Sequence, residues 1–491
     1  MSLAWIALTL LAQNPAPEAK AEISYEPNPP AQTLAQPPPE EVSQTDPMAM
    51  EPEKQEPPTE AEKTTLGEPT DPAKAARGRS LFRGAVELVA HSLPSGTPGG
   101  RQDLFLNVVP MISVDTGDHF GFELGAPLRL RVFDEVPAQR DGDYAGILRG
   151  ADWDQTSDYG QLLRDLWLGS DAAPLRLRAG PLRRVSLGRG LLVSRYSNQL
   201  NPDYHPLGAI FSGEAGPVHA QVLASDVLAA RLFALEVSGD IGGFLGDAAQ
   251  RGRYHLTLSA GHDFGQAGGN TEPVTVMLVE ADAAIYQGES IRSFAYGAIG
   301  SRLLTTDFAM GGMLGVSADG ELGGALMGLK LEGRKLGGGF RFGMFGPGYE
   351  LARFSDMGFT LQGISLARLP DSFSGFTELQ LELGHSADLA TSRSGALVFS
   401  ASAEYFSFNR LDVDAAVTTR LPGDLATFTG RFTLTGFNQV PRYMGSAEAR
   451  YRFAPSFYAL AHGGIVFFPQ PDLTLVRGFF AGVGVGADFS H

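Results

Sequence analysis

Three polar side chains offer the ingredients of a hydrolase site, namely His205, Ser212 and Asn198. A nucleophilic serine needs a histidine as its base and an acid or amide that orients the histidine, all close together in space. No hydrolase motif surrounds these residues, and in a chain with 9 histidines chance alone brings some of them near a serine. His262 and Asp263 are interpreted as loop residues. We therefore expect no enzymatic activity, and enzyme function is kept only as an alternative.

The motifs of common metal and cofactor sites are missing from the sequence. There are 0 cysteines, which excludes disulfide bonds, thiolate metal sites and thiol catalysis. No H-E-x-x-H sequence, EF-hand loop, P-loop or dinucleotide fingerprint occurs, and the G-V-G-V-G run at 482–486 has the wrong spacing to bind phosphate. We expect neither a cofactor nor a catalytic metal.

Positive charge is the more distinctive chemical feature, because arginines are concentrated between residues 176 and 195. Arg176 and Arg178 alternate with Leu175 and Leu177, so in a strand both guanidinium groups point to the polar face. They could attract anions at a constriction, or they could pair with carboxylates and brace the wall. We favour the second interpretation and keep the first open. The arginines of this segment are Arg176, Arg178, Arg183, Arg184, Arg189 and Arg195.

The elements that must position these arginines are predicted to be β-strands. From Arg77 onward, short segments alternate apolar and polar residues and are separated by Gly, Pro, Asp and Asn. This period of two gives each strand one apolar and one polar face. Segments of this kind lie at 128–132, 175–178, 378–383, 411–418 and 427–435.

Alternation alone does not separate a soluble sandwich from a membrane barrel, and three other features favour the barrel. No uninterrupted run of 18 strongly apolar residues follows the N-terminal segment, and only helices and closed barrels can pair every backbone group in lipid. Phe and Tyr gather near the expected strand ends, as in the aromatic girdles of membrane barrels. The C-terminal sequence G-F-F-A-G-V-G-V-G-A-D-F-S-H resembles the closing strand of bacterial outer-membrane barrels, which ends in an aromatic residue that the barrel-assembly machinery reads. Phe489 is the candidate assembly signal, although it is third from the end.

Chain length predicts the size of the barrel. The roughly 415 residues from 77 to 491, at about 23 per strand with its connections, predict an all-β, transmembrane antiparallel β-barrel of about 16–20 strands, with 18 as the preferred number. A barrel of 16–18 strands holds an aqueous channel unless something plugs it. The candidate lumen-lining residues are Arg176, Arg178, Arg189 and Arg195.

Two segments precede the barrel. Residues 1–12, M-S-L-A-W-I-A-L-T-L-L-A, are predicted to be a signal peptide, because the apolar run is too short to span a bilayer. Residues 13–76 carry about 14 of the 32 prolines and about −9 of the net charge of −17. Such a composition cannot bury enough apolar surface to fold, and it predicts a disordered Pro/Glu-rich periplasmic arm. The arm is either a spacer or a tether to peptidoglycan or a periplasmic protein. The net negative charge of the chain argues against nucleic acid as a partner, because nonspecific nucleic-acid binding depends on a basic surface.

The stretch from Tyr159 to Asp226 has a distinctive arrangement of short motifs. It contains L-G-R-G at 187–190, Y-x-N at 196–198 and N-P-D at 201–203, followed by G-A and S-D pairs. This arrangement resembles one found in outer-membrane barrels of deltaproteobacteria and spirochaetes, most of which are uncharacterised. The resemblance covers about 70 residues. It implies a barrel in the outer membrane and implies no catalytic residue.

Three functions are compatible with these features. The preferred one is a pore for small solutes across the outer membrane, with membrane lipid and the barrel-assembly machinery as partners. The second is a non-enzymatic barrel component of an envelope-spanning machine, for polysaccharide export or surface motility, whose arm binds a periplasmic partner. The third is an outer-membrane enzyme.

Overall fold

The computed structural model describes residues 82–94, 102–117, 119–134, 147–170, 173–199, 202–229, 231–265, 273–303, 308–350, 370–384, 396–438, 442–469 and 475–490. The predicted signal peptide at 1–12 and the predicted arm at 13–76 lie outside the described residues.

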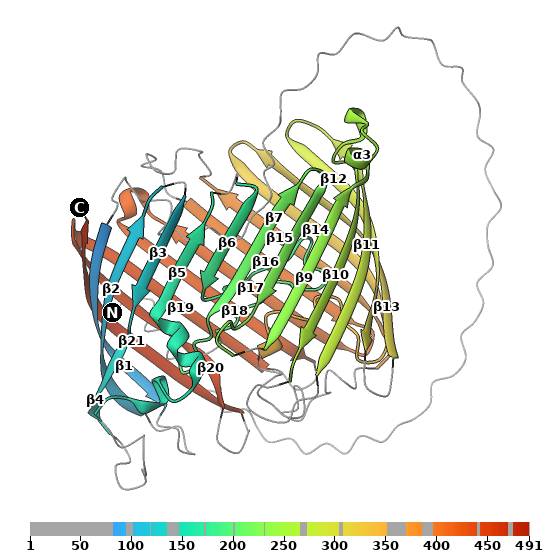
Figure 1. Ribbon diagram of the computed structural model, residues 1–491. Coiled ribbons are helices and arrows are strands. Elements are labelled where there is room, and N and C mark those ends of the chain that lie inside the picture. Colours follow the sequence, from blue (N-terminus) through green and yellow to red (C-terminus); the bar gives the residue numbers. More distant parts are fainter. Residues whose placement is uncertain are drawn as a thin grey trace, which may run out of the picture. The chain divides into compact units, whose positions relative to one another are not determined.

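The strands form one closed antiparallel sheet (Figure 1). Apart from β4, which among the described strands pairs only with β2, each strand pairs with neighbours on both sides. The ring closes because β1 pairs with β2 on one edge and with β21 on the other. The strands are β1 (Phe82–Pro94), β2 (Gln102–Asp115), β3 (Phe120–Gly125), β4 (Leu128–Phe133), β5 (Leu163–Leu168), β6 (Leu175–Gly180), β7 (Gly208–Ala215), β8 (Val218–Ala224), β9 (Leu232–Asp240), β10 (Tyr254–Asp263), β11 (Val274–Gln287), β12 (Ile291–Leu303), β13 (Phe308–Leu322), β14 (Ala325–Leu336), β15 (Ser372–Leu383), β16 (Ala396–Phe406), β17 (Arg410–Arg420), β18 (Ala426–Phe437), β19 (Arg442–Ala454), β20 (Phe457–Pro469) and β21 (Leu475–Ser490).

Short helices lie in the connections between strands. They are η3 (Gly150–Asp152), η4 (Thr156–Leu162), α3 (Ile241–Phe244), η5 (Ala248–Gln250) and η7 (Pro422–Asp424). In the part of the chain that the structure describes, no helix combines the length and the apolar character that a membrane crossing requires.

Strands β3 and β4 share one position in the ring. β3 pairs with residues 111–115 of β2, and β4 pairs with residues 104–108 of the same strand. The interruption between them falls at Ala126 and Pro127, and proline has no N–H group to donate to a neighbouring strand. The 21 strand segments therefore fill 20 positions.

The barrel thus has 20 strands, which lies at the upper limit of the predicted range, and the preferred number of 18 is wrong. The expectation rested on about 23 residues per strand with its connections. Several turns are much shorter than that value allows, because only two residues join β7 to β8, β13 to β14 and β19 to β20. Shorter turns leave residues for two more strands.

The predicted alternation of outward apolar and inward polar residues is confirmed. On β4, Val132 is 70 % exposed while Arg129 is 5 % exposed. On β17, Asp412 and Asp414 are buried on the inside of the barrel. The outward face of β21 exposes Phe479, Val483, Val485 and Phe489.

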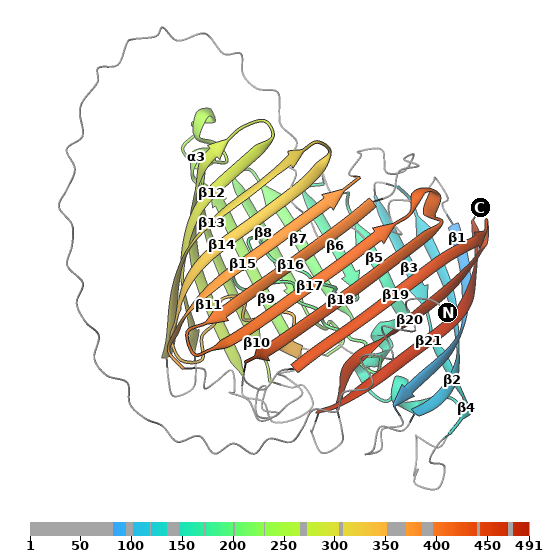
Figure 2. The ribbon, with the colours of Figure 1, turned by 180° about the vertical axis from the view of Figure 1, so that it is seen from behind.

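The two ends of the barrel differ in their connections. Because the number of strands is even, β1 begins and β21 ends at the same end, where Arg83 lies opposite Ser490. We call this the terminal end, and Figures 1 and 2 show α3 at the same end as the C-terminus. The three longest connections, 134–162, 181–207 and 337–371, all leave from the opposite end, which we call the loop end. Long loops on one side and short turns on the other are typical of outer-membrane barrels.

Candidate functional site

The connection between β6 and β7 folds into the barrel as a hairpin, which we call the lumen hairpin (residues 181–199). Val185 and Tyr196 exchange two backbone hydrogen bonds, each of 2.8 Å, and close the hairpin. Its turn has positive φ at Gly188 (48°) and Gly190 (78°), a backbone region that glycine enters without a steric penalty. The L-G-R-G motif of the sequence is therefore the turn of this hairpin.

The three residues considered for hydrolysis lie beside the lumen hairpin, where Asn198 has a structural role. Its amide oxygen accepts a hydrogen bond of 2.8 Å from the Leu182 backbone, and its amide nitrogen donates one of 2.8 Å to the Ser225 carbonyl. Burial, together with the nearby Arg129, lowers the pKa of His205 to about 4. Ser212 lies on β7, and its register partner is Arg176.

The connection after β14 also enters the lumen, and we call residues 337–350 the inner loop. Its backbone adds to the lumen hairpin, because Phe345 accepts a hydrogen bond of 3.1 Å from Ser194 and donates one of 3.2 Å to Leu192. The loop interpretation of Asp263 is wrong, since this residue ends β10 and accepts a hydrogen bond of 2.6 Å from the Tyr349 hydroxyl. His262 likewise lies in β10. The two segments therefore form one body inside the barrel.

The body is held by an apolar core, which is unusual for a barrel interior that otherwise carries charged side chains. Phe340, Phe342 and Phe345 are at most 1 % exposed. The core combines the two segments with inward residues of the wall. Its members include Leu182, Val185, Leu187, Leu192, Val193, Tyr196, Phe340, Phe342, Met344, Phe345 and Tyr349 from the segments, and Leu223, Leu232, Val276, Leu278, Tyr296, Met313, Phe406 and Phe467 from the wall.

Wall glycines make room for the rings of the inner loop. A Cβ atom at Gly261 would lie 2.3 Å from the ring of Phe345. Cβ atoms at Gly300 and Gly311 would lie 2.6 Å and 2.5 Å from the ring of Phe340. Such distances are far below van der Waals contact, so the body can sit against the wall only where these strands lack side chains.

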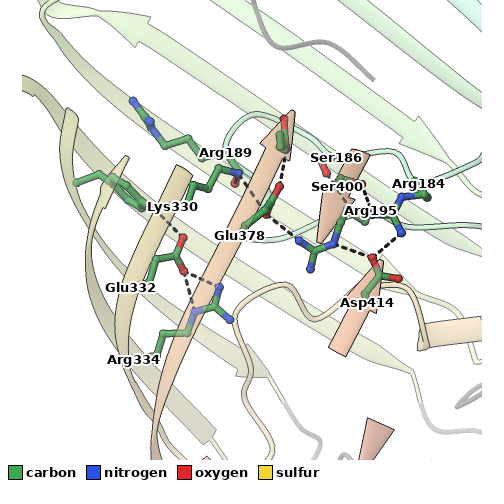
Figure 3. Close-up of polar contacts among 12 residues, drawn as sticks. Arg184, Ser186, Arg189, Arg195, Lys330, Glu332, Arg334, Glu378, Ser400 and Asp414 are labelled. Carbon is green, nitrogen blue, oxygen red and sulfur yellow. Dashed lines mark hydrogen bonds and ion pairs between the residues drawn. The ribbon is translucent and has the colours of Figure 1, made fainter. Parts of the chain in front are cut away.

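Arg184 connects the lumen hairpin to the far wall. Its guanidinium bonds Asp414 at 2.5 Å and Ser400 at 2.9 Å (Figure 3). These partners lie on β17 and β16, and β16 is ten positions from β6 in the ring of 20. The hairpin that leaves β6 therefore spans the lumen to the opposite side.

Arg195 makes a second attachment beside the first. It bonds Glu378 on β15 at 2.7 Å, and its Nε lies 3.4 Å from Asp414. Lys330 reaches the same carboxylate at 3.6 Å (Figure 3). Glu378 is 5 % exposed, so the ion pairs are shielded from water.

Arg189 attaches the tip of the hairpin to a third part of the wall. It lies 3.1 Å from Glu280 and 3.2 Å from Asp282, both on β11. Its guanidinium also stacks on the rings of Phe294 and Tyr296, at 4.7 Å and 5.0 Å from their centroids. Contacts of this kind combine charge with the face of an aromatic ring.

Arg341 fixes the inner loop in the same manner. Its Nη2 atom lies 3.0 Å from a carboxylate oxygen of Glu404 on β16 and 3.0 Å from one of Asp412 on β17. Burial opposes its charge, but the two carboxylates outweigh that effect and hold the pKa of Arg341 above its usual range. The guanidinium is therefore charged at every physiological pH.

The four predicted lumen-lining arginines fall in two places. Arg176 and Arg178 lie on the wall, where their register partners are Ser212, which is 7 % exposed, and Ile210, which packs against the apolar core. Arg189 and Arg195 lie in the lumen hairpin and pair with carboxylates. The structure does not bring the four into one ladder.

The acidic partners of these arginines were missed by sequence reasoning. They come from β11, β15, β16 and β17, which follow the lumen hairpin by about 80 residues or more in the chain, and each is a buried inward residue of its strand. The alternation marked several of them as inward, but it held no sign of which arginine would meet which acid. They are Glu280, Asp282, Glu378, Glu404, Asp412 and Asp414.

Phe489, the candidate assembly signal, lies near the end of β21. It is 57 % exposed on the outer face, and its register partner on β1 is Gly84. The residue therefore sits at the junction between the first and last strands. Its recognition by the assembly machinery stays a prediction.

No family model and no curated protein matches the sequence. Among solved structures, OccAB4 of Acinetobacter baumannii is 7 % identical with a TM-score of 0.34, over 85 % of this chain and 100 % of that chain. OccK11 (OpdR) of Pseudomonas aeruginosa is 9 % identical with a TM-score of 0.33, over 85 % and 99 % of the two chains. CdiB from Acinetobacter baumannii is 9 % identical with a TM-score of 0.27 over 83 % of this chain, which spans 60 % of the length of CdiB. Similarities this low carry no functional argument, and the barrel architecture rests on the strand pairing of this chain. The resemblance of residues 159–226 to particular bacterial barrels stays a prediction.

Proposed function

We propose that this protein is a pore for small solutes in the bacterial outer membrane. The observation that carries the proposal is a closed 20-strand barrel that exposes apolar side chains outside and keeps charged ones inside. An outward apolar face matches lipid, and a polar interior matches water and hydrophilic solutes. The lipid of the outer membrane is then the first partner of the chain.

Along one side of the lumen, a solute route can pass beside the body that the lumen hairpin and the inner loop form. The ion pairs of the lumen hairpin and the inner loop reach β11 and β15–β17. On β19, β20 and β1, three hydrogen bonds join inward side chains to one another within the wall. Glu448 bonds Arg450, Tyr458 bonds Glu87, and His462 contacts His91. We place the solute route between the body and this polar wall.

Planar-bilayer recording of the full-length refolded protein tests the proposal. We expect stepwise conductance increases that are absent when the protein is boiled before addition. The folded form should also migrate differently from the boiled form on a gel. A folded, heat-modifiable barrel without conductance would contradict the pore function.

A second candidate function is a non-conducting barrel in an envelope-spanning machine. The observation that favours it is the internal body, which is fixed across the lumen by buried ion pairs. It predicts no conductance, together with capture of a periplasmic protein or peptidoglycan that is lost when residues 13–76 are removed.

A further inference from the structure

Two arginines in the lumen lack the carboxylate partners that the other arginines of the hairpin have. Among the described residues, Arg183 of the lumen hairpin and Arg431 of β18 make no ion pair or hydrogen bond through their guanidinium groups. Arg183 is exposed and Arg431 is partly buried. Neither guanidinium group therefore has a carboxylate bonded to it, although Asp414 and Glu448 lie close enough to interact with Arg431 electrostatically.

Their positions place the two guanidinium groups near one another. Asp414 accepts hydrogen bonds from Arg184 at 2.5 Å and from Thr433 at 2.9 Å. Arg183 directly precedes Arg184, and Arg431 is two residues from Thr433 on the same inward face of β18. Arg183 and Arg431 therefore each lie beside a residue that bonds the same carboxylate, that of Asp414.

The carboxylates nearest to the pair are already engaged. Asp414 is bonded by Arg184 and Thr433, and it also lies 3.4 Å from Arg195. Glu448 on β19 lies two positions from Ser446, the register partner of Arg431, and it bonds Arg450 at 2.9 Å. The two cations therefore remain in excess.

A partly buried cation beside a second cation is unfavourable unless an anion compensates both. Guanidinium groups match the planar oxygen pairs of carboxylates and phosphates, and each such bond is charge-assisted. The Ser446 side chain lies on the same inward face, opposite Arg431, and can donate a further hydrogen bond.

We infer that Arg183 and Arg431 form a binding site for an oxyanion, a carboxylate or a phosphate, on the solute route through the lumen. The inference rests on the proposed pore function for its transport role but not for binding itself. The arginines that pair with wall carboxylates hold the body in place, and this unpaired couple contacts the solute. The pore then prefers anionic solutes.

Binding is tested with detergent-solubilised full-length protein titrated with inorganic phosphate and, separately, with succinate. We expect either anion to raise the unfolding temperature, because a ligand of the folded state stabilises it. Arg431→Gln should weaken binding about tenfold, as expected for loss of one charge-assisted bond, and Arg431→Lys should restore part of it. The matched control is Arg292→Gln on β12. It removes a guanidinium that bonds Asp319 at 2.8 Å, and it lies neither on β18, with Arg431, nor in the lumen hairpin, with Arg183. Equal binding to the wild type and the Arg431→Gln variant, or no binding to the wild type, would overturn the site.

Transport is tested by the reversal potential in a salt gradient across a planar bilayer. The wild type should prefer anions, and the Arg183→Gln/Arg431→Gln double variant should lose most of that preference while keeping its conductance. Unchanged selectivity in a conducting double variant would overturn the role in transport. If no variant conducts, the pore function fails, and the titration still decides whether the anion site exists.

Discussion

At the residue scale, the arginines of the lumen divide by partner rather than by sequence position. Arg183 and Arg184 are adjacent in the chain, yet only the Arg184 guanidinium bonds a carboxylate, that of Asp414 on the far wall, while the Arg183 side chain is exposed. Buried pairs of this type are costly to break, since the remaining charge stays in a poorly solvated place. The structural and the solute-binding interpretations of the arginines thus apply to different residues.

We predict that Arg184→Gln destabilises the barrel, because Asp414 would lose its principal partner at a buried site. Loss of one member of a buried pair costs about 3–5 kcal/mol. The matched control is Arg292→Gln, whose pair with Asp319 is partly exposed and contributes about 0–1 kcal/mol. The folded fraction against temperature, read from gel mobility, measures both variants. Similar losses in the two variants would contradict a bracing role for Arg184.

At the element scale, the lumen hairpin and the inner loop act as a single insert that the wall is shaped to accept. The insert has its own apolar core, and its aromatic rings lie against strands that carry glycine at the contact. Close packing of this kind tolerates little added volume.

We predict that Gly261→Ala disturbs the insert, because the new methyl group would overlap the Phe345 ring. Overpacking of a well-packed core costs about 1–3 kcal/mol. Gly333→Ala is the matched control, since nothing lies within 4 Å of its Cβ position. Thermal unfolding should separate the two variants, and the conductance of Gly261→Ala should fluctuate more than that of the wild type. Equal stability of the two variants would show that the inner loop does not pack as described.

At the scale of the whole molecule, the closed ring leaves no unpaired strand edge along the first and last strands. β1 and β21 pair over ten residues, so the chain ends meet at the terminal end. The loop end carries the long connections that supply the insert. In outer-membrane barrels the long loops face outward and the short turns face the periplasm.

Orientation is testable because the chain has 0 cysteines, so a single introduced cysteine is the only reactive thiol. Thr156→Cys lies in the connection between β4 and β5 at the loop end, and Ser290→Cys lies in the turn between β11 and β12 at the terminal end. Both positions are exposed. A bulky maleimide should label Thr156→Cys on intact cells and Ser290→Cys only after the cells are opened. Labelling in the reverse order would show the opposite orientation, and recovery of both proteins in the soluble periplasm would contradict the outer-membrane location.

The sequence by itself determined the architecture, because the period-two pattern decides which side chains face inward on each strand. Leu128 and Arg129, or Val413 and Asp414, take opposite faces in any sheet that they join, whatever their neighbours are. Turn residues and chain length set the approximate number of strands. The expected number of 18 was too low because it used an average length for each connection, whereas several turns have only two residues and the barrel has 20 strands.

Only the tertiary structure decided what the arginines do. Arg184 meets Asp414, 230 residues later in the chain, because a hairpin leaves β6 and crosses the ring to its opposite side. No local pattern encodes that crossing, since it depends on the closure of the barrel and on glycines at 261, 300 and 311 that accept the insert. Local periodicity is a property of neighbouring residues, whereas pairing across a lumen depends on where distant strands lie once the ring is closed.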